Sequence, residues 1–199
     1  MEPLVFVYAD ESCLGNQHMD RDNPGGAGVL LEHWRGDAWE RRDAWVSDPA
    51  TTNNRMAIRS GIVALESLKR PSRVVFTSDS SYLVKGMSEW VHGWARRGWK
   101  RKTGAVENAE LWRELCRVAA RHSIDWRWVK GHAGHPQNEY ANHLATRAAK
   151  KLDWSGGAVR SGFEAWLAEE REKRERYFDF IEHAAPAESG FRPAPLPPR

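Results

Sequence analysis

The chain has 199 residues, of which 41% are hydrophobic and 29% are charged, with a formal net charge of +3 and a pI near 9.0. This length allows one domain with a sizeable core and an appendage, and the two cysteines, Cys13 and Cys116, exclude a disulfide framework or a cysteine-rich metal site. No apolar run approaches the roughly 20 residues that a membrane span needs, and no signal peptide precedes the first apolar run, so we expect a cytoplasmic protein.

The charge is unevenly distributed along the chain. Residues 1–152 carry 23 Lys/Arg and 18 Asp/Glu, a net charge of +5, whereas residues 153–199 carry 7 and 9, a net charge of −2. A basic main region favours an anionic partner, and we expect nucleic acid.

Two short apolar runs each end in an aspartate. The run from Leu4 to Ala9 leads into Asp10, and the run from Val74 to Phe76 leads into Asp79. Runs of this length, rich in β-branched and aromatic residues, predict strands buried on both faces of a sheet. Read alone, Asp10 is a turn residue or a metal ligand. If the two strands lie in parallel, however, both carboxylates meet at one edge of the sheet, where α/β folds bind ligands.

The remaining pattern alternates strands and helices. Residues 28–34 and 39–46 predict a hairpin, and residues 124–129 alternate cleanly, which is typical of a strand near a sheet edge. We expect a helix capped by Asn53 or Asn54, which ends near residue 69. Further helices are expected over residues 82–95, 107–121 and 136–151, the last beginning at Pro136.

The composition changes after Trp154. A glycine-bearing linker at residues 155–157 precedes a charged helix expected over residues 163–183, and residues 184–199 contain five prolines, which favour a disordered or extended tail. We therefore divide the chain into a domain of residues 1–152 and an extension of residues 153–199. We expect that deleting the extension leaves the fold nearly intact, and that its helix is a candidate site for a protein partner.

Five sequence blocks, in order along the chain, carry a family resemblance. They are Tyr8–Asn16, Thr51–Met56, Thr77–Ser80, the basic and tryptophan-rich stretch Trp90–Lys100, and Trp128–His135. Through them, residues 4–151 resemble a bacterial type 1 ribonuclease H. The resemblance implies an α/β fold, with an RNase H-like five-stranded mixed sheet flanked by helices, to which this chain adds the helical extension and the Pro-rich tail.

The resemblance also implies an activity. It is the endonucleolytic hydrolysis of the RNA strand of RNA–DNA hybrids, by a monomer that holds two Mg²⁺ or Mn²⁺ ions with four carboxylates. Two of these ligands match Asp10 and Asp79. His132 matches the loop histidine that assists the departure of the leaving group, although a histidine there could also be a solvent-exposed loop residue.

Two expected carboxylates are replaced in this chain. Ala57 stands where the family has glutamate, and Asn142 stands where it has aspartate. Alanine cannot bind a metal ion, and asparagine offers only a neutral, weaker oxygen ligand. Two readings stay open: an endonuclease with an altered or weakened metal site, or an inactive relative, natural or engineered, that binds hybrid or duplex without cutting it.

Four acidic residues are candidate substitute ligands. Glu11 follows Asp10 directly, although a regular strand would direct its side chain to the opposite face. Glu139 shares a helix face with Asn142. Asp20 and Asp22 lie in a loop that is longer than in the family and begins beside the site, where ordinary solvation would also explain them.

The residues that match nucleic-acid contacts are better preserved. Asn16 matches a residue near the scissile phosphate, and three residues at the start of a helix match contacts to the hybrid backbone and minor groove: Thr52, Asn53 and Asn54. In the basic stretch, tryptophans alternate with cations that favour phosphate binding: Trp90, Trp94, Arg96, Arg97, Trp99 and Lys100. The tryptophans would also pack the stretch against the domain.

Overall fold

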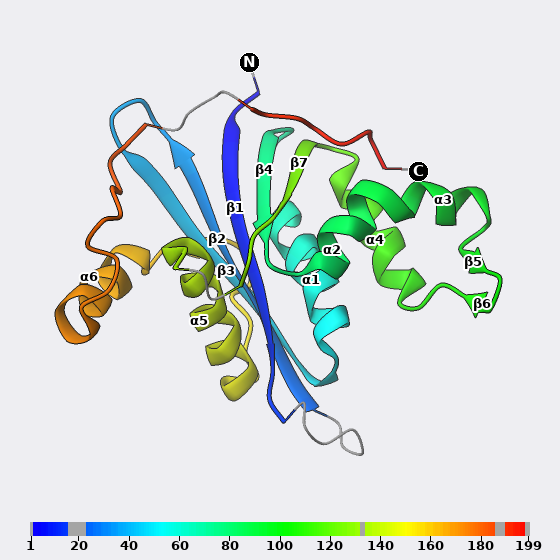
Figure 1. Ribbon diagram of the computed structural model, residues 1–199, viewed down its shortest axis with the longest axis horizontal. Helices are drawn as coiled ribbons and strands as arrows, with labels where there is room; N and C mark the ends of the chain where they lie inside the picture. The colour runs from blue at the N-terminus through cyan, green and yellow to red at the C-terminus, as the bar shows by residue number, and fades with distance from the viewer. Residues whose placement is uncertain (1, 16–22, 132–133, 186–189, 198–199) are drawn as a thin grey trace.

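A computed structural model describes residues 2–15, 23–131, 134–185 and 190–197. The described chain builds a six-stranded mixed sheet with helices on both faces (Figure 1), and β5 (Lys100–Arg101) and β6 (Gly104–Ala105) form a separate two-stranded sheet. The strands of the six-stranded sheet are β1 (Leu4–Cys13), β2 (Asn23–Trp34), β3 (Trp39–Thr51), β4 (Arg73–Ser78), β7 (Ser123–Trp128) and β8 (Val159–Arg160), in the spatial order β7-β4-β1-β2-β3-β8. The five expected strands are confirmed, with β7 at one edge, and the extension adds β8 as a short sixth strand at the other edge.

Helices connect and cover these strands. They are α1 (Asn53–Glu66), α2 (Ser81–Lys85), the π-helical turn η1 (Gly86–Trp90), α3 (Val91–Arg96), α4 (Ala109–Ala119), α5 (Pro136–Lys151) and α6 (Phe163–Arg174). The cap of α1 is Thr52 rather than either asparagine, because its hydroxyl oxygen accepts a hydrogen bond from the Arg55 N–H at 3.3 Å. None of the described helices is long and apolar enough to cross a bilayer.

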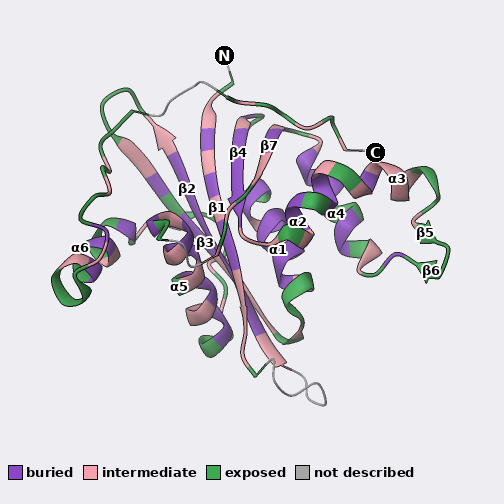
Figure 2. Cartoon of the chain, viewed as in Figure 1, coloured by how far each residue is buried: buried purple, intermediate pink, exposed green. Residues whose placement is uncertain are grey.

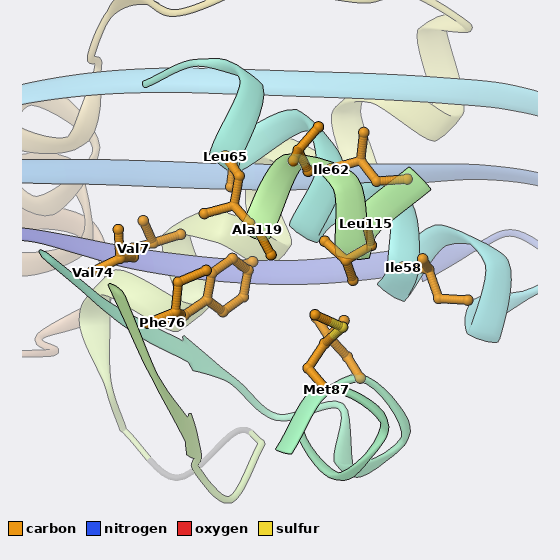
Figure 3. Packing of buried hydrophobic residues seen from close by; sticks show 14 of the residues in the cluster. Val7, Ile58, Ile62, Leu65, Val74, Phe76, Met87, Leu115 and Ala119 are labelled. Carbon is orange, nitrogen blue, oxygen red and sulfur yellow. The ribbon is translucent and has the colours of Figure 1, made fainter. Parts of the chain in front are cut away.

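The first face of the sheet carries the main apolar core. Val7, Val74 and Phe76 of the strands meet Ile58, Ile62 and Leu65 of α1, and Leu115 and Ala119 of α4 and Met87 of η1 complete this cluster, as Figure 3 shows. On β1 the residues that face this cluster are Val5, Val7 and Ala9, all buried. The intervening residues of the strand, Phe6 and Tyr8, are only half-buried, so burial on both faces was wrong for β1.

The second face is covered by α5 and the extension. Helix α5 lies directly on β2, where a Cβ atom at Gly26 or Gly28 would overlap the carbonyl oxygen of Ala145 or Ala141. These two glycines therefore let the helix approach the strand closely. Gly28 is paired with Asp10 in the β1–β2 register, so this close approach brings α5 beside the end of β1 where the carboxylates emerge.

The extension follows a path that its composition did not predict. Helix α6 ends at Arg174 rather than near residue 183, because Glu175 adopts a left-handed conformation with φ of 52°. The chain then turns back so that Tyr177 packs with Phe163 and Leu167 against α5. Residues 190–197 run beside β7, where the Ala194 N–H donates to the Ile124 carbonyl oxygen at 2.8 Å.

Candidate metal site and nucleic-acid surface

Three carboxylates meet where β1 and β4 carry their chains to the same edge of the sheet. The two strands are parallel neighbours (Figure 1) with Ala9 opposite Ser78, so Asp10 and Asp79 follow at the same level of the sheet, as expected. Glu11 joins them. One ligand oxygen from each of the three side chains lies within 4.8 Å of the others, which is the spacing of a site that could hold a metal ion. Carboxylate oxygens are hard ligands that suit Mg²⁺ or Mn²⁺.

The position of Glu11 follows from the strand itself. β1 continues to Cys13, so Glu11 lies within the strand and not beyond its end. Alternation places it in the series of Val5, Val7 and Ala9, on the face that packs against α1. Asp10 lies on the opposite face, where the Asn138 side chain of α5 reaches it. Two adjacent residues therefore approach one site from the two sides of the sheet.

Helix α1 presents the small side chain of Ala57 to the face of β1 on which Val5, Val7 and Ala9 lie. Ala57 is fully buried in the same apolar cluster as Val5, Val7 and Ala9. A glutamate at position 57 would extend from α1 toward the same face of β1 that Glu11 occupies.

The carboxylate cluster is electrostatically unfavourable without a cation. Burial, and secondly the negative charge of Asp79, raise the pKa of Asp10 to about 8, against hydrogen bonds from the Glu11 N–H at 2.7 Å and the Asn138 amide at 3.2 Å. Burial, together with the charges of Asp10 and Asp79, also raises the pKa of Glu11 well above its ordinary value. Glu11 Oε2 is buried and finds no hydrogen-bond partner within the described chain. A divalent cation would relieve both the repulsion and the missing contact, so these residues fit a metal.

Helix α5 contributes amides rather than carboxylates. Asn138 is 3% exposed and donates to Asp10 Oδ2. Asn142 follows one turn later on the same helix face; it is half-buried, and its Oδ1 accepts a 3.5 Å hydrogen bond from the Thr146 hydroxyl. Asn138 was missed by the sequence analysis, although its position four residues before Asn142 was a usable signal.

The other candidate ligands are not part of the described cluster. The Glu139 carboxylate lies 3.8 Å from the Arg176 guanidinium of the extension, and it contributes no oxygen to the three-carboxylate group. Asp20, Asp22, Asn16 and His132 lie outside the described residues. Gly131 precedes His132 and lies against the site, because a Cβ atom there would overlap Asp79 Oδ2.

Two exposed surfaces hold the residues that the sequence predicts to contact nucleic acid. Thr52, Asn53 and Asn54 are exposed at the start of α1. In the basic stretch, Trp94 packs against Trp90, Trp99 and Trp112, at ring-centroid distances between 5.6 and 6.4 Å. The cations between them are exposed: Arg96, Arg97 and Lys100. The tryptophans therefore build the protrusion, and the cations are the groups available to phosphates.

Comparison with known proteins agrees with this geometry. The RNase H family model matches residues 2–150. A ribonuclease H of Shewanella sp. (strain ANA-3) is 45% identical over 148 residues, covering 74% of this chain and 88% of that protein. A ribonuclease H of Shewanella halifaxensis is 47% identical over 147 residues, covering 73% and 86%. The crystal structure of LC9-RNase H1, described as a type 1 RNase H with the type 2 active-site motif, is 53% identical with a TM-score of 0.90, covering 100% of this chain and 95% of that chain.

Proposed function

Because the chain belongs to the ribonuclease H family, we propose that it hydrolyses the RNA strand of RNA–DNA hybrids at a metal site in which Glu11 replaces the missing glutamate of α1. The observation that carries the proposal is the convergence of Asp10, Glu11 and Asp79 within 4.8 Å. The similarity to LC9-RNase H1 supports it, since the altered active-site motif is the distinguishing feature in that protein's description.

The residues of the site have separate tasks in this proposal. Asp10, Glu11 and Asp79 would hold Mg²⁺ or Mn²⁺, which when bound activates water and stabilises charge at the phosphate. Asn138 keeps the Asp10 carboxylate oriented through its amide, and Asn142 offers a neutral oxygen on the α5 side. His132 is proposed to assist the leaving group. The site would thus hold its metal ions with three negative charges rather than four.

Hybrid recognition would use the exposed polar and basic groups. Thr52, Asn53 and Asn54 are placed for contacts that depend on minor-groove shape and the 2′-hydroxyl, and the cations of the protrusion for contacts to phosphates. We propose a cytoplasmic monomer. In the extension, Phe163, Leu167 and Tyr177 pack within the chain, whereas Phe178 and Ile181 are exposed, and a protein partner for the extension stays a prediction.

A cleavage assay with an RNA–DNA hybrid tests the role of Glu11. Glu11→Gln keeps the size of the side chain but removes its charge, and we expect Mg²⁺-dependent cleavage to fall by about 100-fold or more, beyond what the loss of an outer-shell group causes. Glu139→Gln is the matched control and should change the rate less than about tenfold. Calorimetric titration with Mg²⁺ should show weaker binding to Glu11→Gln in the absence of substrate.

Moving the carboxylate from position 11 to position 57 gives a second test of the role of Glu11. Glu11→Ala should be nearly inactive, and adding Ala57→Glu should restore a large part of the activity by supplying a carboxylate from α1. Cleavage by Glu11→Gln at the rate of the unchanged protein would remove Glu11 from the site. The second candidate function, a hybrid binder that no longer cuts, is favoured by the two replaced ligands, and it would be supported if the unchanged chain bound hybrid but did not cleave it in Mg²⁺ or Mn²⁺.

A further inference from the structure

Trp128 is an exposed aromatic residue beside the metal site. It is the last residue of β7, paired with Ser78, and it directly precedes the loop in which Gly131 lies against Asp79. The residue is 55% exposed, which is unusual for a tryptophan, because the ring carries a large apolar area that proteins normally bury. Trp126, two residues earlier, shows the usual behaviour and packs on Phe76 with ring centroids 4.6 Å apart.

The indole of Trp128 has a fixed orientation despite this exposure. Its Nε1–H donates to the Asp79 carbonyl oxygen at 2.8 Å, which satisfies the one polar group of the ring. No aromatic ring in the described chain stacks on it at the distances that the other tryptophans show. The ring is thus held at the residue that supplies a metal ligand, with an apolar face directed to solvent.

We propose that Trp128 is a substrate-contacting residue, whose exposed face packs on the ribose of a nucleotide next to the phosphate that is cut. This inference rests on the proposed function. The bases of a hybrid are stacked inside the duplex, so an aromatic residue beside the backbone meets the apolar side of a sugar rather than the face of a base. A ring already fixed by the Asp79 carbonyl loses little conformational freedom when the sugar packs on it.

The same hydrogen bond gives Trp128 a second effect on the site. It ties the main chain of Asp79 to the end of β7, so loss of the indole N–H would loosen a metal-ligating residue. Two substitutions separate contact from positioning. Trp128→Phe keeps an aromatic face and loses the N–H donor, whereas Trp128→Ala loses both.

Equilibrium binding of a fluorescently labelled RNA–DNA hybrid, measured in EDTA so that no cleavage is needed, is the primary test. We expect Trp128→Ala to raise the Kd by about tenfold and Trp128→Phe by less than about threefold, in line with aromatic contacts to nucleic acid. Trp154→Ala is the matched control, since Trp154 is 72% exposed in the extension, and it should leave the Kd unchanged. The melting temperatures of all three variants verify that each is folded.

Steady-state cleavage provides the second measurement. The contact predicts a raised KM for Trp128→Ala, while positioning alone would lower kcat equally in Trp128→Ala and Trp128→Phe. An unchanged Kd for Trp128→Ala, or equal losses of binding in the two variants, would overturn the contact. If the unchanged chain binds hybrid without cutting it, the proposed cleavage fails while the comparison of Kd values still decides the role of Trp128.

Discussion

The two faces of the sheet are closed in different ways. On the first face, α1 and α4 belong to the part of the chain that the family model matches, and they cover a continuous apolar cluster. On the second face, α5 alone packs on glycines of β2, and the extension completes the cover with Phe163, Leu167 and Tyr177. Burial alternates along the first half of β1, whereas β2 is buried over most of its length (Figure 2). The second face of this domain depends on a segment outside the family match.

The two faces also differ in the interactions that fasten them. The first is almost wholly apolar, whereas the second contains buried polar groups. Asp43 accepts hydrogen bonds from the Tyr140 hydroxyl at 2.6 Å, the Ser161 hydroxyl at 2.6 Å and the Gly162 N–H at 3.0 Å. Arg41 forms an ion pair with Glu32 at 2.6 Å, with both side chains at most 5% exposed. Such groups require their partners, so the extension is bound by directional contacts as well as by apolar packing.

Removal of the extension, residues 153–199, should lower the melting temperature more than any other change considered below. Truncation after Leu152 would uncover Tyr140 and Leu144. It would also remove two of the three hydrogen-bond donors of Asp43, the Ser161 hydroxyl and the Gly162 N–H. With about 1.5–3 kcal/mol for each buried apolar side chain that is lost, we expect a fall in melting temperature on the order of 10 °C or more. This reverses the expectation, drawn from charge and composition alone, that deletion leaves the fold nearly intact. Calorimetry of residues 1–152 decides between them, and a fall below about 3 °C would show that the second face closes without the extension.

Loss of the Asp43 carboxylate, which accepts hydrogen bonds from the extension, should lower the stability by an intermediate amount. Asp43→Asn keeps the shape of the side chain but offers one acceptor oxygen to three donors, so at least one buried donor loses its partner. We expect a loss of about 1–3 kcal/mol in the free energy of unfolding, measured by urea denaturation. Asp37→Asn, in an exposed turn, is the matched control. In the chain truncated after Leu152 the effect of Asp43→Asn should shrink, and an undiminished effect would show that Asp43 does not act through the extension.

The last residues should have the smallest effect on stability. Residues 190–197 contact the edge strand β7 through the Ala194 N–H and through the Arg192 N–H, which donates to Asp125 Oδ2 at 3.0 Å. Truncation after residue 189 should lower the melting temperature by no more than about 2–3 °C, because little apolar area is lost. It would leave a strand edge open, so we expect more aggregation on heating, measured by light scattering. A fall in melting temperature as large as that of the chain truncated after Leu152 would contradict the inference that α6, and not residues 190–197, stabilises the domain.

Much of the fold and part of the site could be predicted because their signals are local. The apolar runs before Asp10 and Asp79 identify two neighbouring parallel strands, Pro136 marks the start of α5, and the family blocks identify the common architecture. Glu11 was one of four candidate ligands. Strand alternation counted against it, because a regular strand directs adjacent side chains to opposite faces.

The tertiary structure decided what depends on space between distant segments. Glu11 reaches the cluster from the face of β1 that packs with Ala57 of α1, and residue spacing along the chain carries no information about which helix covers that face. Similarly, the charged composition of residues 153–199 indicated a solvated appendage, yet three of its apolar residues, Phe163, Leu167 and Tyr177, pack against α5. The reason is that periodicity reports which residues can face a core, whereas which core they meet depends on close approaches such as that of α5 to Gly26 and Gly28.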